Sequence, residues 1–251
     1  MSYPQYREKQ RIIAQMHYGN LFRDRYIVLR YKKNLQLIKK ILNTKKTIRI
    51  LDAGGYTADN LEFWKQQGID TSKIEYHVAD YDKAIKPIVE SRGGILKFYD
   101  FNHDDLTKLY SKQHFDLIIC TEVLEHLLDP EKQLGFFKIL LKKNGHILIS
   151  LPNENTIFHR IYSLLGLGID QYPFALYKHL HFPTVKQSHD FLSRNFQITN
   201  HLYYFNFSGT GSRMGFIGAI LSRIPDVVWQ PLVNLFPGLL ARGTIFLCKL
   251  K

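Results

Sequence analysis

The chain has 251 residues, of which 45% are hydrophobic and 14% aromatic, enough for one large α/β domain or two small ones. Its two cysteines, Cys120 and Cys248, lie in apolar runs, which argues against a disulfide framework and predicts buried thiols. The opening stretch, MSYPQYREKQR, is polar and has no apolar core of a secretory signal. We therefore expect a cytoplasmic protein.

The formal net charge of +12 is concentrated at the N-terminus. Residues 1–50 contain 13 of the 34 Lys and Arg residues but 2 of the 22 Asp and Glu residues, so they carry +11 of the total. A solvated helix face accounts for such a cluster. An anionic membrane surface or a nucleic-acid backbone as partner accounts for it equally well, and the charge alone does not choose between them.

Strand-like and helix-like runs alternate from residue 48 onward. Several of the strand-like runs are almost continuously apolar, as expected for a parallel sheet that is covered on both faces. The pattern predicts an α/β fold with a Rossmann-like, doubly wound, mostly parallel sheet and a C-terminal antiparallel strand. The strands are expected at 48–53, 74–80, 95–100, 115–121 and 146–151, followed by two late strands at about 196–205 and 243–250.

Two helices carry clear start signals. Asp129 can cap a helix whose first turn contains Pro130, and the Asn144-Gly145 pair is expected to end it. Thr184 and Gln187 have the spacing of a capping box for a second helix. The first helix would turn an apolar stripe inward, made by Leu134, Phe137, Leu140 and Leu141.

Two segments fall outside this alternation, and a third precedes it. Residues 1–47 are predicted to form a basic helical segment that packs on the main domain, 48–251, through a stripe of apolar side chains. Cap insertions are expected at about 153–182, which is rich in aromatic residues, and about 206–242. The longest uncharged run in the second insertion, Val227–Ala241, has 15 residues, short of the roughly 20 that a membrane-spanning helix needs.

The ends of the first four strands carry residues suited to a nucleotide-like ligand. In an open α/β sheet, ligands bind at the carboxyl ends of the strands, near the point where the strand order reverses. The first strand ends in Asp52–Gly55, where small residues let a ligand approach the backbone. Asp80 could accept hydrogen bonds from a ribose diol, and Asp100 beside Phe101 would suit an adenine ring. The fourth strand ends at Thr121-Glu122.

A longer stretch carries a family resemblance. Residues 115–153, FDLIICTEVLEHLLDPEKQLGFFKILLKKNGHILISLPN, resemble the signature region of class I S-adenosylmethionine-dependent methyltransferases. The nearest relatives in character are methyltransferases of quinone, lipid and small-metabolite pathways. The resemblance covers residues 45–153 well and 183–250 loosely, and it implies S-adenosylmethionine as the cofactor.

The glycine loop departs from the family pattern. The family usually has D-x-G-x-G-x-G, whereas this chain has DAGGYTA, with Tyr56 in place of the second glycine and Ala58 in place of the third. The resemblance implies that the methionine end of S-adenosylmethionine lies against Asp52 and Gly54, that Asp80 holds its ribose, and that Asp100 holds its adenine. The full set of implied cofactor-binding residues is Asp52, Ala53, Gly54, Gly55, Asp80, Tyr81, Asp100, Phe101 and Thr121.

Methyl transfer from a sulfonium needs alignment and exclusion of water more than a dedicated acid. A general base matters where the acceptor is a hydroxyl, and His126, in EVLEH, is the candidate; a structural histidine is the alternative. His179 and His181 would lie on one face of a strand, which invites a metal site. The sequence offers no cysteine or clear carboxylate partner for the pair, so no metal is predicted.

Three functions remain open at this point. The first is a methyltransferase for a small, apolar or lipid-linked acceptor, acting in the cytoplasm or peripherally at an anionic membrane, with the apolar insertions and basic N-terminus as support. The second is an RNA methyltransferase, although no RNA-binding module is visible. The third is a non-enzymatic binding protein on a methyltransferase fold, motivated by the irregular glycine loop. The sequence leaves the oligomeric state undetermined.

Overall fold

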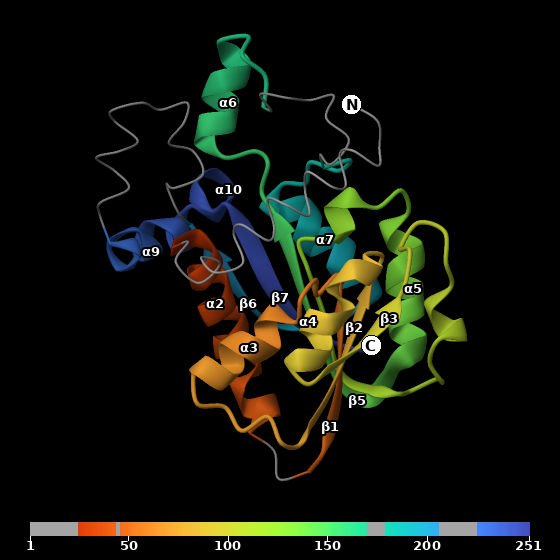
Figure 1. The fold of residues 1–251 in the computed structure, drawn as a ribbon. Coiled ribbons are helices and arrows are strands. Elements are labelled where there is room, and N and C mark those ends of the chain that lie inside the picture. The colour runs from red at the N-terminus through yellow and green to blue at the C-terminus, as the bar shows by residue number, and fades with distance from the viewer. Residues whose placement is uncertain (1–24, 44–45, 170–178, 206–224) are drawn as a thin grey trace.

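The computed structural model describes residues 25–43, 46–169, 179–205 and 225–251. In this part of the chain, strands form one seven-stranded sheet in the order β3-β2-β1-β4-β5-β7-β6 (Figure 1). The strands are β1 Ile48–Ala53, β2 Ile74–Asp80, β3 Gly94–Phe98, β4 Phe115–Thr121, β5 Leu141–Pro152, β6 Gln197–Tyr204 and β7 Gly243–Lys249.

The sheet is parallel from β3 to β5, and β7 runs antiparallel to both of its neighbours, β5 and β6. The predicted fold class is therefore confirmed. The strand order reverses at β1, which lies between β2 and β4. In open sheets of this kind, such a reversal opens a crevice for ligands outside the carboxyl ends of the strands.

Helices cover both faces of the sheet (Figure 1). Alternate strand residues point to opposite faces, which separates the core into two layers: Ile50 and Ile119 pack towards α2 and α3, whereas Leu51 and Ile118 pack towards α5 and α7. The helices are α2 Arg25–Leu42, α3 Asp59–Gln66, α4 Lys86–Ser91, α5 Pro130–Leu140, α6 Ile157–Leu164, α7 Val185–Asn195, α9 Asp226–Leu235 and α10 Pro237–Leu240, with 3₁₀ turns η2 Lys83–Ile85, η3 Leu106–Lys108 and η4 Leu124–His126.

Helix α2 packs on the sheet through its apolar stripe. Leu35, Ile38 and Leu42 are buried in the same core layer as Trp64 of α3, and Ile41 packs partly against it. Full burial of each such aliphatic side chain is worth about 1.5–3 kcal/mol. The helix is thus part of the folded domain, while its lysines, such as Lys32 and Lys40, remain exposed.

The expected helix caps form as the sequence indicates. The carboxylate of Asp129 accepts a hydrogen bond from the Lys132 backbone N–H at 2.9 Å, and Thr184 and Gln187 form a capping box. The predicted stop at Asn144-Gly145 was wrong, because α5 ends at Leu140. Leu141 is already extended and pairs with Phe115, and residues 142–145 bulge out of the pairing between β4 and β5.

Parts of the predicted segments lie outside the described residues. These are 1–24 and 44–45 of the basic segment, 170–178 of the first insertion, and 206–224 of the second. The described part of the first insertion contains α6, and that of the second contains α9 and α10. Among the residues that the structure describes, no helix is both long enough and apolar enough to cross a membrane.

Candidate active site

The loop between β1 and α3 has the backbone shape of a glycine-rich turn, although only two of its residues are glycine. Gly54, Tyr56 and Ala58 have φ angles of +73°, +46° and +60°, respectively. Left-handed backbone costs a residue with a side chain about 1–2 kcal/mol, so the surrounding structure must hold Tyr56 and Ala58 in place. A Cβ added at Gly54 would lie 2.4 Å from the Val123 side chain, which explains the glycine there.

An arginine at the end of α4 holds this loop. The Arg92 guanidinium donates to the Thr57 carbonyl at 2.8 Å and forms a 2.5 Å ion pair with Asp59, the first residue of α3. Both side chains of the pair are largely buried. Breaking such a pair from one side costs about 3–5 kcal/mol. Arg92 thus offsets the backbone strain of a loop that lacks the usual glycines.

Asp52 lies beneath the loop and is almost fully buried. Its carboxylate accepts hydrogen bonds from the Asn60 side-chain amide at 3.0 Å and from the Tyr76 hydroxyl. Burial raises the pKa of Asp52 to about 6, against the lowering effect of these two hydrogen bonds. The Asp52 side chain also leaves no room for a side chain at position 55, because a Cβ at Gly55 would lie 2.4 Å from the Asp52 carboxyl carbon.

Asp80, the last residue of β2, is directed at the same loop. Its two carboxylate oxygens accept hydrogen bonds from the backbone N–H groups of Tyr56, at 3.2 Å, and Asp82, at 3.1 Å. Burial raises the pKa of Asp80 to about 6 despite these bonds. A carboxylate has about four lone-pair positions, so Asp80 retains acceptor capacity for hydroxyl donors of a ligand. Tyr81 beside it is half exposed.

Asp100 lies two residues after the end of β3. Its carboxylate accepts from the Asn102 backbone N–H at 3.0 Å and lies 3.2 Å from the His103 ring. Burial works to raise its pKa, but these contacts prevail and hold the pKa below its usual value. Phe101 is partly exposed, and its ring packs edge-on against Tyr99 with centroids 4.8 Å apart. An ionised acceptor therefore lies beside an aromatic face.

The end of β4 is fixed by Glu122, which the sequence placed at this strand end without assigning it a role. Glu122 follows Thr121 with φ of +57°. Its carboxylate accepts from the Ser150 hydroxyl at 2.7 Å and the Tyr204 hydroxyl at 3.0 Å, and lies 3.5 Å from the Arg30 guanidinium. These contacts connect β4 to β5, β6 and α2. The signal for Glu122 in the sequence is its position, because it is an acidic residue directly after an apolar strand.

Turn η4 brings together acidic and imidazole side chains. Glu125 is buried, and within the described residues no other residue donates a hydrogen bond to its carboxylate. Burial, with the nearby charge of Glu122, raises the pKa of Glu125 well above its usual range. The rings of His126 and His179 meet edge-on, with centroids 4.6 Å apart.

The two histidines expected on one strand face are not in a strand. His179 Nδ1 lies 2.7 Å from Glu154, whereas His181 donates from Nε2 to the Leu127 carbonyl at 2.8 Å. The two imidazoles therefore have separate partners. The structure also supplies His179 with the carboxylate partner that the sequence did not reveal, because Glu154 is distant along the chain.

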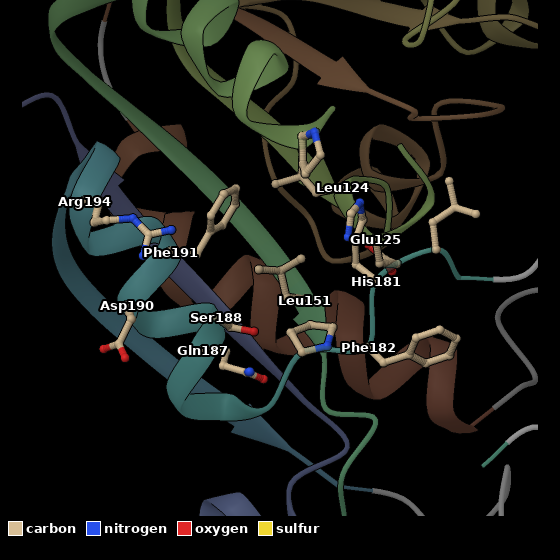
Figure 2. A pocket seen from close by; sticks show the side chains of 13 residues that line it. Leu124, Glu125, Leu151, His181, Phe182, Gln187, Ser188, Asp190, Phe191 and Arg194 are labelled. Atoms are coloured by element: carbon tan, nitrogen blue, oxygen red, sulfur yellow. The ribbon is translucent and has the colours of Figure 1, made fainter. Parts of the chain in front are cut away.

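A pocket of about 520 Å³ opens beside η4 (Figure 2). Figure 2 shows Glu125 and His181 on one side and Phe191 and Arg194 of α7 on the other, with Leu151 of β5 between them. Most of its wall area is apolar, with polar or charged groups at Glu125, His181, Ser188, Asp190 and Arg194. The remaining lining residues are Leu124, Pro130, Leu180, Phe182, Pro183 and Gln187.

The residues predicted to bind a cofactor all lie at the carboxyl ends of four adjacent strands, or directly after them: β3, β2, β1 and β4. The Asp80–Tyr56 bond connects two of these ends directly. The methyltransferase domain family matches residues 23–199, well over half of the chain. The chain belongs to this methyltransferase family. The family and its S-adenosylmethionine cofactor, both expected from the sequence, are thereby confirmed.

Curated relatives of the methyltransferase lie at low identity. The ubiquinone biosynthesis O-methyltransferase of Histophilus somni is 27% identical over 140 residues, 54% of this chain and 57% of that protein. The mitochondrial ubiquinone biosynthesis O-methyltransferase of Dictyostelium discoideum is 24% identical over 163 residues, 60% of this chain and 50% of that protein. The chain thus spans about half the length of these curated relatives.

Solved structures share the fold of the methyltransferase. An S-adenosylmethionine-dependent methyltransferase from Archaeoglobus fulgidus has a TM-score of 0.53 at 17% identity, covering 90% of this chain and 100% of that one. Another, from Mesorhizobium loti, has a TM-score of 0.54 at 13% identity, covering 86% and 97% of the two chains. At these identities the likeness concerns the fold alone.

Proposed function

We propose that the protein transfers a methyl group from S-adenosylmethionine to an oxygen of a small, apolar or lipid-linked acceptor. The main support for this class of acceptor is the largely apolar pocket beside η4. Its wall includes Glu125, the residue before His126 in the chain. The curated relatives are O-methyltransferases of ubiquinone biosynthesis, which agrees with an oxygen acceptor and an apolar molecule.

The cofactor roles proposed here follow the geometry of the strand ends. Asp80 would accept hydrogen bonds from the ribose hydroxyls, because its carboxylate is held in place and keeps free lone pairs. Asp100 and Phe101 would hold the adenine, with Tyr81 nearby. Backbone groups of residues 52–55 and Thr121 would line the methionine side. Gly54 and Gly55 have no side chain, so the cofactor can approach the backbone there. A side chain at either position would also collide with its neighbours.

The reaction requires alignment of the acceptor oxygen with the methyl group and the sulfur, and one proton transfer. S-adenosylmethionine, when bound, supplies an electrophilic methyl group on a sulfonium. The acceptor hydroxyl gives its proton to a base, its oxygen forms the new O–C bond, and the C–S bonding pair goes to sulfur. His126 is proposed to take that proton, and general-base assistance of this kind is worth about 10²–10⁴-fold in rate. The apolar walls of the pocket would exclude water.

The other candidate functions have weaker support. The exposed lysines of α2 suit an RNA backbone as well as a membrane. The pocket beside η4 contains one arginine, Arg194, and two phenylalanines, Phe182 and Phe191, but most of its wall area is apolar, which suits an apolar acceptor better than a nucleotide. The irregular glycine loop motivates the non-enzymatic alternative. The loop nevertheless has three left-handed residues and is held by Arg92, which supports cofactor binding.

Calorimetric titration with S-adenosylmethionine and S-adenosylhomocysteine tests the cofactor site. We expect micromolar binding that Asp80→Ala abolishes and that Asp70→Ala, at an exposed turn, leaves unchanged. Transfer of a labelled methyl group to phenols with alkyl tails of increasing length then tests the acceptor class. Turnover that rises with tail length supports the proposal. Binding without turnover on any phenol, or transfer to RNA instead, would refute it.

A further inference from the structure

Glu75, His77 and His114 bring one carboxylate and two imidazoles together near the start of β2, at the opposite end of this strand from Asp80. One possible ligand atom from each residue lies within 4.8 Å of the others. Glu75 and His77 are two residues apart on β2, so their side chains lie on the same face of the sheet. His114 directly precedes β4. One carboxylate and two imidazoles are a ligand set that Zn²⁺ accepts, with a fourth position left for water.

The facing atoms of Glu75 and His77 are already spaced almost as two ligands of one ion. Glu75 Oε1 and His77 Nε2 lie 2.9 Å apart and share a hydrogen bond. Two ligands of a tetrahedral zinc ion lie about 3.3 Å apart, given bonds of about 2.0–2.2 Å. A cation can therefore replace the shared proton with little movement of either side chain. The Glu75 side chain is 36% exposed, which gives an ion access from solvent.

Two neighbouring side chains orient the outer members of this group. The Arg49 guanidinium donates to Oε2 of Glu75 at 2.9 Å, while Oε1 faces His77. The Ser111 hydroxyl lies 3.1 Å from Nδ1 of His114, which leaves Nε2 as the available nitrogen. Metal ligands characteristically have such second hydrogen bonds, which fix the tautomer of a histidine and the orientation of a carboxylate.

The turn that carries His114 is strained and firmly held. Gln113 has φ of +52°, a left-handed conformation that is unfavourable for a residue with a side chain. The backbone N–H groups of Gln113 and His114 donate to the carbonyls of Ile139 and Leu140, at 2.9 and 2.8 Å. Strained backbone persists where the surrounding structure holds it, and it occurs preferentially at functional sites. The turn places the His114 ring 6.0 Å from that of His77, between centroids.

Two buried polar atoms in this group need a partner. His77 is 6% exposed and Tyr110 is 8% exposed, and their rings meet edge-on with centroids 5.4 Å apart. Within the described residues, neither Nδ1 of His77 nor the hydroxyl of Tyr110 has a hydrogen-bond partner. Buried polar atoms without a protein partner are costly, and ions and waters are a common way to satisfy them. A cation with a bound water would reduce this cost.

The charges around His114 are compatible with metal binding, which requires a neutral imidazole. Burial, followed by the positive charge of Arg49, lowers the pKa of His114, and Lys142 acts in the same direction. Each of these cations is paired with a carboxylate: Arg49 with Glu75 at 2.9 Å, and Lys142 with Asp116 at 2.8 Å. Their repulsion of a bound cation is therefore largely offset.

We propose that Glu75, His77 and His114 bind a Zn²⁺ ion that fastens the turn before β4 to the start of β2. This inference goes beyond the proposed function and does not rest on it. Glu75 and Asp80 are five positions apart on β2, roughly 16 Å at about 3.3 Å per residue. The ion therefore takes no part in methyl transfer. It stabilises the fold, because a ligand that binds only the folded chain raises the melting temperature.

The test uses the full chain after treatment with a chelator and dialysis. Calorimetric titration with ZnCl₂ gives the number of ions bound and their affinity. Glu75→Gln and His114→Ala should each bind one zinc ion fewer per chain than the wild type. Ser111→Ala should weaken the binding of that ion by about 10-fold, as expected for the loss of an orienting partner. His103→Ala is the control, because His103 is an exposed histidine outside the group, and it should bind as the wild type does.

The melting temperature with and without zinc is the second measurement. Zinc should raise it more in the wild type and His103→Ala than in Glu75→Gln or His114→Ala. S-adenosylhomocysteine binding checks the folding of every sample, and neither zinc nor these substitutions should change it. Equal numbers of zinc ions in the wild type, Glu75→Gln and His114→Ala would overturn the site and leave a hydrogen-bonded polar cluster. Loss of a zinc ion in His103→Ala would overturn it as well.

Discussion

The carboxylate of Asp80 accepts a hydrogen bond from the backbone N–H of Tyr56, with the two atoms 3.2 Å apart. This bond joins the end of β2 to the loop after β1 at a residue whose left-handed backbone would ordinarily require glycine. The acid proposed to hold the ribose therefore also shapes the loop proposed to hold the methionine end. The ionisation of Asp80 should consequently affect cofactor binding in both places.

Cofactor affinity should fall in mildly acidic solution. Burial raises the pKa of Asp80 to about 6, and the ionised form is the one that accepts hydrogen bonds from a ribose. If the cofactor binds only that form, the dissociation constant for S-adenosylhomocysteine should rise about tenfold between pH 7 and pH 5. Calorimetry across this range measures it. Asp80→Asn should bind weakly with a flatter profile, and a wild-type constant that is the same at pH 5 and pH 7 would contradict the prediction.

Asp52→Asn should stabilise the protein at neutral pH. The folded-state pKa of about 6 lies above the unfolded value of about 3.9, so the folded state holds the proton more tightly. Stability contributed by the neutral acid is present below about pH 4 and is lost as pH rises through 6. Asparagine stays neutral and its oxygen can still accept from Asn60 and Tyr76. We expect a gain on the order of 1–3 kcal/mol in the free energy of unfolding at pH 7.5.

Urea unfolding at pH 7.5 and pH 4.5 measures this change, and the gain should shrink at the lower pH. Asp70→Asn is the control, because Asp70 is exposed and its bonds from Ser72 lower its pKa. That variant should show no gain at either pH. An Asp52→Asn protein that is less stable than the wild type at pH 7.5 would mean that burial of the charge is not the dominant effect.

Gly54→Ala should damage both stability and the cofactor site, whereas Gly68→Ala should affect stability only mildly. Both glycines have φ of +73°, so both variants carry a left-handed alanine at about 1 kcal/mol or more. A Cβ at Gly54 would lie 2.4 Å from Val123 Cγ2, whereas a Cβ at Gly68 meets nothing within 4 Å. The difference between the two melting temperatures therefore isolates the clash. S-adenosylhomocysteine binding that survives in Gly54→Ala would place the cofactor elsewhere.

The sequence predicted the strands well because burial on both faces leaves a strong signal. The predicted bounds of 48–53, 74–80 and 115–121 match the structure, and β3 and β5 differ only at their ends. The end of α5 was misplaced because local turn residues at Asn144-Gly145 are also compatible with a bulge inside a strand. Local chemistry predicts a break in regular structure, but the register of the neighbouring strand decides which kind it is.

The acidic strand ends were visible in the sequence because each follows an apolar run. The group around Glu125 was not, since its partners come from segments far apart along the chain. His179 was weighed as half of a pair with His181, yet the structure pairs it with Glu154 and His126. A polar cluster that only tertiary contacts bring together leaves no local pattern in the sequence from which it could be predicted.

A lipid-linked acceptor implies access from a membrane surface, and exposed apolar side chains support such contact. Leu164 of α6 is 86% exposed and Val227 of α9 is 75% exposed. Phe158 of α6 and Trp229 of α9 pack against the same small apolar cluster. Lys33 of α2 donates to a side chain of α9, so basic and apolar groups adjoin. This combination suits an anionic bilayer.

The protein should therefore sediment with anionic liposomes and less so as salt rises. The double variant Leu164→Ser and Val227→Ser should bind less, while its melting temperature and S-adenosylhomocysteine affinity stay unchanged because both side chains are exposed. Ile95→Ser is the control, since Ile95 is an exposed apolar residue on the edge strand β3. Equal sedimentation of the double variant and the wild type, or none of either, would refute contact through α6 and α9. It would leave acceptors free in solution as the substrates to screen.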